Sequence, residues 1–459
     1  MEVVILAAGK GTRMQSEIPK VMHEVGGKPM LAHVLATARM LQAQKTHVVI
    51  GHGAELIKQA FSNSDNGVEP IWVLQSEQLG TGHAVQQAVT GVDTNASANP
   101  VLVLFGDVPL VSISTLESVI SNCNDDSLSL LTVNAANPKG LGRILRDGDG
   151  KIVGIVEEKD ASTEQKEITE VNSGIMAIPA NRLTGWLDAL RSDNQQNEYY
   201  LTDIVALARK DGCEIKSSIA KSEMEVMGVN NKSQLAQVER YFQMSQIEEF
   251  LLAGLTVRDP SRIDVRGDLQ FGSDCIIDCN VILEGKVSLG SGVSIGANCI
   301  IKNAKIGDGA YILPGTLIED SEVGENASVG PMARIRPGSI LGAESKIGNF
   351  VETKNARIGK GSKASHLAYL GDVEIGDGCN IGAGTIVCNY DGVNKHKTKL
   401  GNNVFVGSNS VLVAPLDLAD NAFVAAGSAI NTDVPPHTLA VGRAKQRNIA
   451  GWKRPHKKQ

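Results

Sequence analysis

Aromatic residues are scarce in this sequence of 459 residues, where Phe, Trp and Tyr together make up 4%. Glycine is abundant by contrast, with 48 residues, so part of the interior is expected to be something other than a conventional aromatic-rich core. Long apolar stretches are also lacking, so we expect no membrane span. The first residues lack the basic-then-apolar pattern of a secretory signal, which favours a cytoplasmic protein.

Cysteine pairs of the Cys-x-x-Cys type are absent, and the seven cysteines are an odd number. Cys275 and Cys279 are four positions apart, but no histidine pair accompanies them, so no zinc site is expected. Reduced thiols in a cytosolic protein are the simplest interpretation. The net charge of −7 argues against a general nucleic-acid binder. We therefore expect small-molecule substrates and no nucleic-acid partner.

The first half of the chain alternates short apolar runs with helical patterns. The runs cover 3–6, 46–50, 71–75 and 101–105, and the clearest helical patterns cover 30–41 and 82–89. This alternation predicts an α/β fold, with a mostly parallel, doubly wound sheet and helices on both faces. Ligands of such sheets bind at the carboxyl ends of the strands.

A different pattern begins near residue 231. Apolar residues recur at helical spacing over 233–252, which predicts one long helix, either a rigid strut or a core helix of the first domain. We favour the strut because the rhythm changes completely after it. The expected organisation is a first domain over 1–230, a linker helix over 231–252 and a second domain over 253–459.

The second domain carries a six-residue repeat from 271 to 430. An apolar residue recurs every sixth position, with a slip of one at Ile306 and a break between Val387 and Leu400. Thr353 occupies the one repeat position that is not apolar. A fixed six-residue period predicts a parallel β-helix whose coils each contain three short strands. Small aliphatic side chains fill so narrow an interior, which explains the scarcity of aromatics.

The C-terminal segment from His437 onward has seven Lys or Arg residues and no acidic residue. It is either a solvated tail or an arm that reaches an anionic ligand. Composition alone favours the tail.

The stretch "LAAGKGTRM" at 6–14 follows the first apolar run and has the character of a phosphate-holding loop. It is neither the dinucleotide fingerprint nor a P-loop, because the third glycine and the Gly-Lys-Ser/Thr ending are missing. Gly9 and Gly11 allow backbone N–H groups to approach phosphate oxygens, and Arg13 and Lys20 add positive charge. A solvated basic turn would explain the charges but not the glycines.

Asp107 closes the apolar run "VLVLFGD". A carboxylate at the end of a strand, beside phosphates, suits Mg²⁺, which takes oxygen ligands. A simple turn cap before Pro109 is the alternative.

Several motifs occur together in order. Gly9-x-Gly11-Thr12-Arg13 with Pro19-Lys20, "QSEQLGTGHA" at 75–84, "FGD" at 105–107, "GIVEEKD" at 154–160, "VNSGI" at 171–175 and "GVNN" at 228–231 resemble the sugar-1-phosphate nucleotidyltransferases. The resemblance is to the uridylyltransferase half of the bifunctional N-acetylglucosamine-1-phosphate uridylyltransferase and glucosamine-1-phosphate acetyltransferase family.

This resemblance implies that the first loop holds the phosphates of UTP while a sugar-1-phosphate attacks the α-phosphorus. Lys20 and Arg13 are then the catalytic cations, and Asp107 and Asn230 hold Mg²⁺. The nucleotide and nucleotide-sugar contacts implied are Leu6, Ala7, Ala8, Gly9, Lys20, Gln75, Gly80, Thr81, Phe105, Gly106, Asp107, Gly142, Glu157, Asn172 and Asn230. Phe105 and Leu141 stand where the family often has Tyr, so contacts through those hydroxyls are not expected.

In the repeat, Arg336 and Lys354 occupy positions where glycine is common. They are 18 residues apart, which predicts adjacent coils about 4.8 Å apart. Two cations so close need an anion such as a sugar phosphate, unless Glu352 merely balances a basic surface. The long insertion "CNYDGVNKHKTK" at 388–399 is expected to line a binding face. His366 lies close by in the coil sequence, although a lone histidine is more often structural.

The stretch from "RIRPG" through "SKASHLAYLGD" to "CNYDGVNKHKT" is similar to the acetyltransferase half of the same family. The resemblance implies a left-handed β-helix, a homotrimer with acetyl-transfer sites between subunits, and His366 as the general base. The amino-sugar-phosphate contacts implied are Arg336, Lys354, Tyr369, Asn380 and Lys395. Those to acetyl-CoA are Ala383, Asn389, Tyr390, Ser408, Ala426 and Arg443. The role of Arg443 favours an arm over a free tail.

The leading hypothesis is an enzyme with two sites that acetylates glucosamine-1-phosphate and then uridylylates the product, with acetyl-CoA and UTP as substrates and Mg²⁺ as cofactor. The UDP-N-acetylglucosamine formed would feed cell-wall and surface-polysaccharide synthesis. One alternative is a nucleotidyltransferase whose β-helix serves only for oligomerisation, and another is a non-enzymatic nucleotide-sugar sensor. Arg336, Lys354 and His366 argue against the first alternative, since a scaffold does not need them. The presence of Lys20, Asp107 and Asn230 together argues against the sensor.

Overall fold

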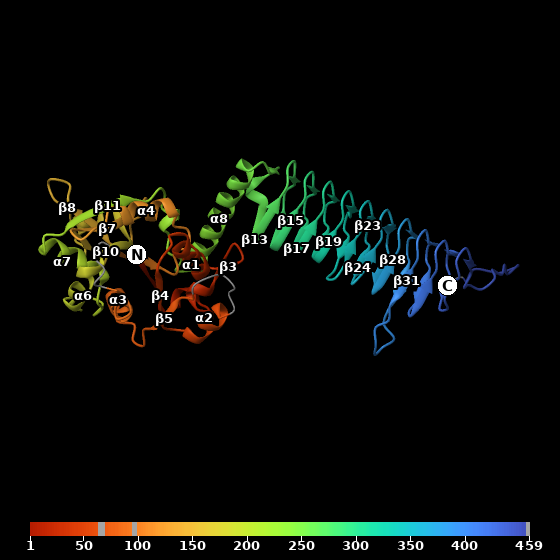
Figure 1. Cartoon of the computed structure of the whole chain (residues 1–459), viewed down its shortest axis with the longest axis horizontal. Helices are drawn as coiled ribbons and strands as arrows, with labels where there is room; N and C mark the ends of the chain where they lie inside the picture. Colours follow the sequence, from red (N-terminus) through yellow and green to blue (C-terminus); the bar gives the residue numbers. More distant parts are fainter. Residues whose placement is uncertain (63–68, 94–98, 456–459) are drawn as a thin grey trace. The chain divides into compact units, whose positions relative to one another are not determined.

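The computed structural model describes residues 1–62, 69–93 and 99–455, which form two compact units, Met1–Phe242 and Gln243–Gln459 (Figure 1). The first unit contains the alternating strands and helices, and the second contains the coils of the repeat. No helix in these described ranges combines the length and hydropathy needed to cross a membrane.

The first unit is built on a mixed sheet with the strand order β11-β7-β10-β6-β1-β4-β5. Its strands are β1 (Glu2–Ala7), β4 (Lys45–Ile50), β5 (Ile71–Leu74), β6 (Pro100–Phe105), β7 (Ser127–Asn134), β8 (Arg143–Arg146), β9 (Ile152–Val156), β10 (Glu170–Pro179) and β11 (Glu214–Ile219). The four strands expected from the apolar runs are β1, β4, β5 and β6, and they pair in parallel. The antiparallel strand β10 is the departure from a uniformly parallel sheet, and the hairpin of β8 and β9 attaches to it.

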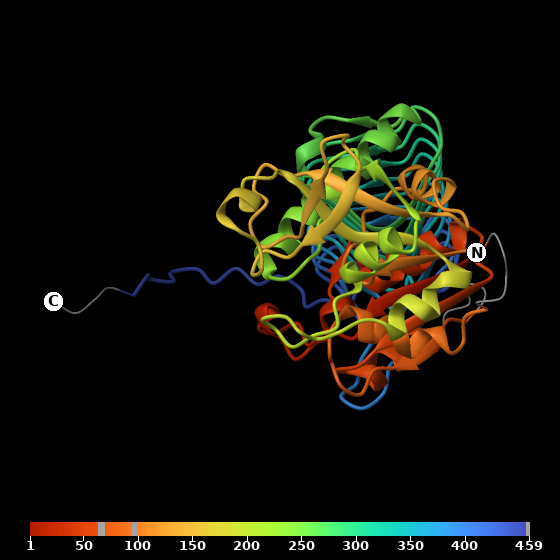
Figure 2. The same cartoon turned by 90° about the vertical axis from the view of Figure 1, so that its left-hand side faces the viewer.

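Alternation along β1 explains the layers of this unit. Val3 and Ile5 belong to one apolar cluster, and Val4 and Leu6 belong to a second on the other face of the sheet. Helices α1 (Met30–Met40), α2 (Ala54–Phe61) and α4 (Ile113–Ser121) contribute to the first cluster; α3 (Thr81–Val89), α6 (Ala180–Asp188) and α7 (Ile204–Lys210) contribute to the second. The expectation of helices on both faces is therefore confirmed (Figure 2).

The remaining short elements of the first unit surround the sheet. They are η1 (Thr12–Met14), η2 (Lys20–Met22), β2 (Glu24–Val25), β3 (Lys28–Pro29), α5 (Thr163–Lys166), η3 (Leu201–Asp203) and η4 (Met224–Val226).

Helix α8 (Lys232–Leu252) contains the point where the two units divide. Val238 in its first half is buried in an apolar cluster with Met14 and Met30 of the first unit. Ile247 in its second half is buried in the core of the β-helix. The helix therefore contributes side chains to both cores instead of acting as a bare strut.

The second unit is a parallel β-helix. After α8 and η5 (Pro260–Arg262), the chain winds through short strands, and each strand pairs in parallel with its equivalent one coil later. One sheet contains β12 (Thr256–Val257), β14 (Ile276–Ile277), β16 (Ser294–Ile295), β18 (Tyr311–Ile312), β20 (Ser328–Val329), β23 (Lys346–Asn349), β26 (Lys363–His366), β29 (Asn380–Ile381), β32 (Phe405–Val406), β35 (Phe423–Val424) and β37 (Leu439–Ala440).

The other two sides of the coil begin as long bent strands and then separate. The bent strands are β13 (Ile263–Phe271), β15 (Val281–Leu289), β17 (Ile300–Ile306) and β19 (Leu317–Val323). One side continues as β21 (Arg334–Ile335), β24 (Glu352–Lys354), β27 (Tyr369–Gly371), β30 (Ile386–Cys388), β33 (Val411–Val413) and β36 (Ala429–Ile430). The other continues as β22 (Ile340–Leu341), β25 (Arg357–Ile358), β28 (Val373–Ile375), β31 (Thr398–Leu400) and β34 (Leu416–Leu418).

Aliphatic residues of the repeat fill the interior of the coils, as the six-residue period predicts. Ile277, Ile295 and Ile312 are registered partners on successive coils, and all are buried. Thr353 is buried as well, and its hydroxyl donates a hydrogen bond to Ser339 Oγ at 3.0 Å. Because the partner satisfies the hydroxyl, a polar residue is tolerated at this repeat position.

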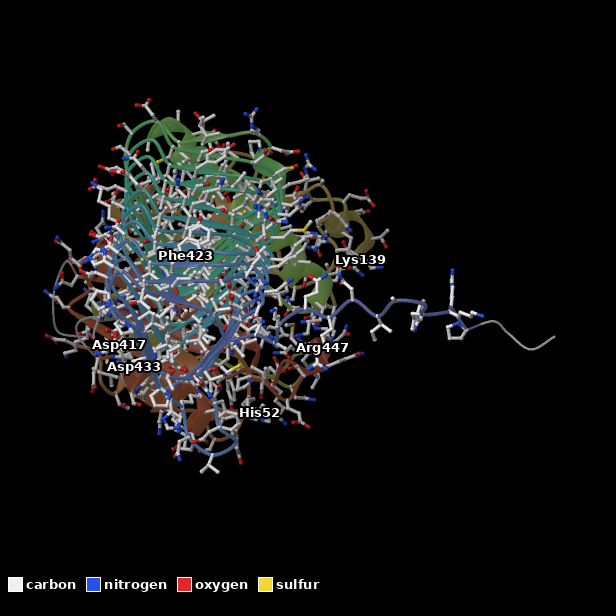
Figure 3. All side chains as sticks on the ribbon, turned by 90° about the vertical axis from the view of Figure 1, so that its right-hand side faces the viewer. His52, Lys139, Asp417, Phe423, Asp433 and Arg447 are labelled. Carbon is white, nitrogen blue, oxygen red and sulfur yellow. The ribbon has the colours of Figure 1, made fainter. Side chains whose placement is uncertain are left out.

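The last coils carry stacked aromatic rings and then release the chain. Phe405 and Phe423 stack on neighbouring strands with their centroids 4.4 Å apart. The main chain of Asp417 donates to the Asp433 carboxylate at 2.8 Å, which ties the final turn to the coil before it (Figure 3). Beyond residue 440, all residues up to 455 are exposed, and Figure 3 shows Arg447 on a segment that leaves the coils.

Candidate active sites

A pocket of about 360 Å³ lies where the parallel strands of the first unit end. Eleven of the residues expected to bind the nucleotide line it: Leu6, Ala7, Ala8, Gly9, Lys20, Gln75, Gly80, Thr81, Phe105, Asp107 and Asn230. Val21, Gln78, Ala84 and Glu198 also line it and were not expected. The strands β1 and β6 are neighbours, and Gly106 N–H donates to the Leu6 carbonyl at 2.9 Å. This contact brings the first loop next to Asp107.

Lys20 is the centre of the charged end of this pocket. Its Nζ lies 2.5 Å from Asp107 Oδ2 and 3.3 Å from Asn230 Oδ1. Arg13 Nη2 also donates to Asn230 Oδ1, at 2.8 Å. Gly11 has φ +60°, and a Cβ there would lie 2.8 Å from Lys20 Cβ, so glycine is needed for this approach.

The two residues expected to hold Mg²⁺ present a suitable set of donors. Oxygen atoms of Asp107 and Asn230 both point at one cationic atom, the Lys20 ammonium. One carboxylate and one amide oxygen leave the remaining positions to water and phosphate, as Mg²⁺ prefers. The residues present therefore fit the ion.

The opposite end of the pocket is shaped by Gln75 and Gly80. Gln75 is buried, and its side-chain amide donates to the Gly80 carbonyl at 3.3 Å. Gly80 has φ +107°, and a Cβ there would lie 2.6 Å from the Tyr199 carbonyl oxygen. The hydroxyl of Thr81, the first residue of α3, accepts from Leu201 N–H at 3.1 Å. These contacts give a rigid slot of the kind a planar base needs.

The three residues expected to contact the sugar are not in the lining of this pocket: Gly142 directly precedes β8, Glu157 directly follows β9, and Asn172 lies in β10. Asn172 N–H donates to the Gly142 carbonyl at 2.8 Å. The Glu157 carboxylate accepts from Thr202 Oγ1 at 3.2 Å, and burial raises the pKa of this carboxyl above its ordinary value. Asn172 Oδ1 is buried and has no hydrogen-bond partner among the described residues, so one acceptor of this group is unsatisfied.

The surroundings of Phe105 and Leu141, which stand where the family often has Tyr, differ. The Phe105 ring packs at Gly174, where a Cβ would come within 2.6 Å of the ring. Leu141 is 42% exposed at the turn before Gly142. Neither side chain offers a hydroxyl to a sugar.

In the β-helix, His366, Ala383, Ser408 and Ala426 form a single column. Each directly precedes a residue with positive φ at the same turn of successive coils, namely Leu367, Gly384, Asn409 and Gly427. Main-chain hydrogen bonds connect these turns: Gly384 N–H donates to Leu367 O, Asn409 N–H to Ala383 O and Gly427 N–H to Ser408 O. The expected base therefore heads the column that contains three of the expected acetyl-CoA contacts. We call these four residues the corner column.

His366 is held from the preceding coil by Asn349. His366 Nδ1 lies 2.6 Å from Asn349 Oδ1, and the two residues are registered partners on β26 and β23. An amide oxygen can only accept, so Nδ1 carries the proton and Nε2 is left as the basic nitrogen. Asn349 was not predicted from the sequence, although its position 17 residues before His366, one coil earlier, was a usable signal.

Three of the expected sugar-phosphate residues lie together on one side of the coil. Arg336 and Lys354 lie on adjacent coils, as expected, and Arg336 Nη1 donates to Glu352 Oε1 at 2.7 Å. The Lys395 side chain, through its hydrogen bond and its charge, and then the Arg336 guanidinium lower the pKa of Lys354 below its ordinary value, and the Asp372 carboxylate opposes them. Glu352 thus balances one cation, and the net positive charge around Lys354 and Lys395 suits an anion.

Tyr369 belongs with this group. Its hydroxyl lies 2.5 Å from where a Cβ of Gly371 would be, so its ring lies along strand β27. Gly371 is the registered partner of Lys354. The Tyr369 hydroxyl therefore lies beside the strand position of Lys354.

The other expected residues lie elsewhere in this chain. Asn380 points outward from another sheet, as the registered partner of Lys363. Asn389 and Tyr390 start the loop that projects next to β31 (Figure 1), at the opposite end of strand β30 from the corner column. The exposed terminal segment carries Arg443. Asn389, Tyr390 and Arg443 therefore lie on other segments than His366, whereas Asn380 lies on the strand next to that of His366 in the same sheet.

A larger hollow, of about 1050 Å³, lies along the earlier coils. Its lining includes Asp268, Lys286, Asp320 and Arg357 but none of the expected site residues. Cavity volume alone would therefore not have identified the charged clusters described above.

Comparison with known proteins identifies related families for both units. The MobA-like NTP transferase domain matches residues 3–144, the GMPPB C-terminal domain matches 263–358, and the hexapeptide repeat of succinyl-transferase matches 397–432. The hexapeptide match, together with the parallel coils, identifies the β-helix as the left-handed type. Two relatives match along essentially their whole length. Bifunctional protein GlmU of Stutzerimonas stutzeri is 51% identical over 458 residues, 100% of both chains. That of Marinobacter nauticus is 53% identical over 457 residues, 100% of this chain and 99% of the relative.

Proposed function

Because this chain belongs to the family of the bifunctional protein GlmU, we propose that the pocket around Lys20 and the surface beside the corner column are its two active sites. The chain is a bifunctional enzyme of UDP-N-acetylglucosamine synthesis. It transfers an acetyl group from acetyl-CoA to glucosamine-1-phosphate and a uridylyl group from UTP to the acetylated product. The observation that carries the two-site proposal is the position of His366 at the head of the corner column, which a passive scaffold does not need.

In the first site, a phosphate oxygen of the sugar-1-phosphate attacks the α-phosphorus of UTP, and pyrophosphate leaves. The protein's task is to hold two anions in line and to offset their charge. Lys20 and Arg13 supply the positive charge, and Gly9 allows the first loop to approach the phosphates closely. Mg²⁺ held by Asp107 and Asn230 would neutralise further phosphate charge. Gln75, Gly80 and Thr81 hold the uracil.

The sugar is held by the wall of Gly142, Glu157 and Asn172. The unpartnered Asn172 Oδ1 accepts from a sugar hydroxyl or from the acetamido N–H. The half-buried Glu157 carboxylate accepts a second hydroxyl. These polar groups discriminate between sugars, because an analogue that lacks the matching hydroxyl or amide group leaves them without a hydrogen-bond partner.

In the second site, the amine of glucosamine-1-phosphate attacks the thioester carbonyl of acetyl-CoA. The N–C bond forms, the C–S bond breaks, and His366 Nε2 takes the proton from the amine. The departing thiolate then accepts that proton and leaves as the free thiol of CoA. Lys354, Lys395 and Arg336 hold the phosphate of the amino sugar, and Tyr369 lies beside it. Ala383, Ser408 and Ala426 support the CoA chain along the corner column.

The acetyl-transfer site is completed by other copies of the chain in a homotrimer. Asn389, Tyr390 and Arg443 lie on other segments than His366 in one chain, and we infer that a neighbouring copy supplies them. An exposed apolar ridge beside the corner column supports this assembly: Met332, Phe350 and Leu367 are 58%, 55% and 58% exposed. Exposed apolar residues in a row are typical of an interface.

The terminal segment fits the role of an arm in such a trimer. It leaves the coils, is exposed from residue 441 to 455 and carries the basic residues that CoA phosphates attract (Figure 2). We place the enzyme in the cytoplasm, where its substrates occur and where thiols stay reduced. All seven cysteines are free, which agrees with a reducing compartment.

A coupled assay tests the proposed function. The full-length protein is supplied with UTP, Mg²⁺ and glucosamine-1-phosphate, and pyrophosphate is measured with and without acetyl-CoA. Release that requires acetyl-CoA supports two working sites with acetylation first. Equal release without acetyl-CoA would contradict this order and would leave the β-helix without a demonstrated reaction.

A further inference from the structure

Arg143 is the largest of the fully buried side chains in the described part of the chain, with 1% of its surface exposed. A buried guanidinium is costly unless hydrogen bonds and an opposite charge compensate it. Its position in β8 places it directly after Gly142, one of the three residues of the sugar wall.

Strand pairing places Arg143 behind the sugar wall. Arg143 is the registered partner of Val156 on β9 and of Val171 on β10. Each of these valines directly precedes a residue of the wall, Glu157 or Asn172. Because side chains alternate between the faces of a sheet, the Arg143 side chain and the wall residues point to opposite faces.

The guanidinium joins two of the segments that carry the wall, those of Gly142 and Glu157. Arg143 Nη2 donates to Glu158 Oε2 at 2.7 Å and to the Lys166 carbonyl at 3.4 Å. Arg143 Nη1 donates to the Leu141 carbonyl. One buried group thus fixes the turn before Gly142, the end of β9 and helix α5.

Glu158 completes the network from the other side. Its Oε2 also accepts from Gly140 N–H at 3.0 Å, so this carboxylate holds both ends of the 140–143 turn. The Gly140 N–H and the Arg143 guanidinium keep the pKa of Glu158 below its ordinary value, so it is ionised when the enzyme works. The network contains no residue that lines the nucleotide pocket.

We propose that Arg143 is a positioning residue for the sugar half of the uridylyl-transfer site, and that it sets the spacing of Gly142, Glu157 and Asn172 from the rear face of the sheet. The proposal rests on the proposed sugar-binding role of these three residues. It assigns Arg143 no contact with substrate. Replacement of Arg143 should therefore weaken binding of the sugar phosphate and leave binding of UTP unchanged.

Arg143→Met in the full-length enzyme tests the proposal. We expect the KM for N-acetylglucosamine-1-phosphate to rise and kcat/KM for that substrate to fall by about 100-fold, since a displacement near 1 Å can have such an effect. The KM for UTP and the acetyl-transfer rate should stay within about twofold of wild type, a spread ordinary for unrelated surface changes. Arg143→Lys should recover only part of the loss, because an ammonium lacks the planar fork that reaches three acceptors.

Two further variants keep the test decisive. Glu158→Gln removes the charge partner at a partly exposed position and should raise the same KM in the same direction, which covers the case that Arg143→Met does not fold. Arg146→Met is the matched control, because Arg146 lies on the same strand with its own partner, Glu170, at 2.7 Å. It should leave both KM values unchanged.

An unchanged KM for the sugar phosphate in folded Arg143→Met, or an equal rise in both KM values, would overturn the proposal. Should Arg143→Met not fold, an unchanged KM in Glu158→Gln would overturn it instead. Failure of the proposed function would be seen separately, as absence of pyrophosphate release in the wild-type enzyme.

Discussion

His366 Nδ1 and Asn349 Oδ1 lie 2.6 Å apart on adjacent coils of the β-helix. This contact fixes the ring and leaves Nε2 as the nitrogen of the proposed base. Lys346 and Lys363 are registered partners three positions earlier on the same two strands, and Asn380 lies on the next strand of that sheet. Asn349 is the residue that makes a hydrogen bond with the imidazole and so orients it.

Asn349→Ala should therefore lower kcat for acetyl transfer by about 10- to 100-fold, part of the contribution of a positioned general base. Asn349→Asp should restore part of the rate and move the acidic limb of the pH–rate profile to higher pH, because a carboxylate favours the charged imidazolium. The pH profile of acetyl transfer checks both. An unchanged profile in Asn349→Asp would show that Asn349 does not act through His366.

Binding of the amino-sugar phosphate should weaken at alkaline pH because of Lys354. Its pKa lies below the ordinary value of a lysine, so its charge is present below that pKa and is lost as pH rises through it. N-acetylglucosamine-1-phosphate, a product without a titrating amine, is the suitable probe, used as an inhibitor of acetyl transfer from about pH 7.5 to 10.

We expect the inhibition constant to rise at lower pH than an ordinary lysine would allow. Lys395→Met should weaken inhibition at neutral pH but move the alkaline rise to higher pH, since it removes the neighbouring ammonium. The control is Lys397→Met, on the same loop but paired with Glu374. An alkaline rise that stays in place in Lys395→Met would contradict this account of Lys354.

Asp107 should determine the Mg²⁺ requirement of uridylyl transfer. Asp107→Asn removes the one carboxylate of the expected metal site and the partner of Lys20. Uridylyl transfer should fall at least about 100-fold, and the Mg²⁺ concentration for half-maximal rate should rise. Acetyl transfer should be unaffected. A fall in rate with an unchanged Mg²⁺ requirement would assign Asp107 a role in holding Lys20 only.

The apolar ridge should be necessary for assembly and for acetyl transfer. Phe350→Glu places a charge at the middle of the ridge, and we expect the proposed trimer to dissociate in size-exclusion chromatography with light scattering. Acetyl transfer should fall with it, while uridylyl transfer remains. Leu56→Glu, at an equally exposed apolar residue of the first unit, is the control. A Phe350→Glu variant that remains trimeric would remove the ridge from the interface.

Much of the fold follows from the sequence because two strong periodicities determine it. The run that ends at Leu6 and the repeat that includes Ile277 and Ile295 were predicted in their correct elements. The antiparallel strand β10 was not predicted, because Asn172, Ser173 and Gly174 interrupt its apolar residues. The charged pocket was predicted through its loop, where Gly11 and Lys20 lie close in sequence.

Other parts of the sites depend on contacts between distant residues. Asn349 supports His366 only because the coil has a length of 17 residues at that point. Arg143 is visible in the sequence as an ordinary surface-type residue, and its burial arises from the pairing of β8 with both β9 and β10. The separation of Asn380 and Tyr390 from His366 also becomes apparent only from the strands to which they belong.

Assays of both reactions in His366→Ala and in Lys20→Ala test whether one chain carries two separate active sites. We expect acetyl transfer to fall about 100-fold or more in His366→Ala, with uridylyl transfer retained. Lys20→Ala should show the reverse. Loss of both activities in either folded variant would contradict two separate sites.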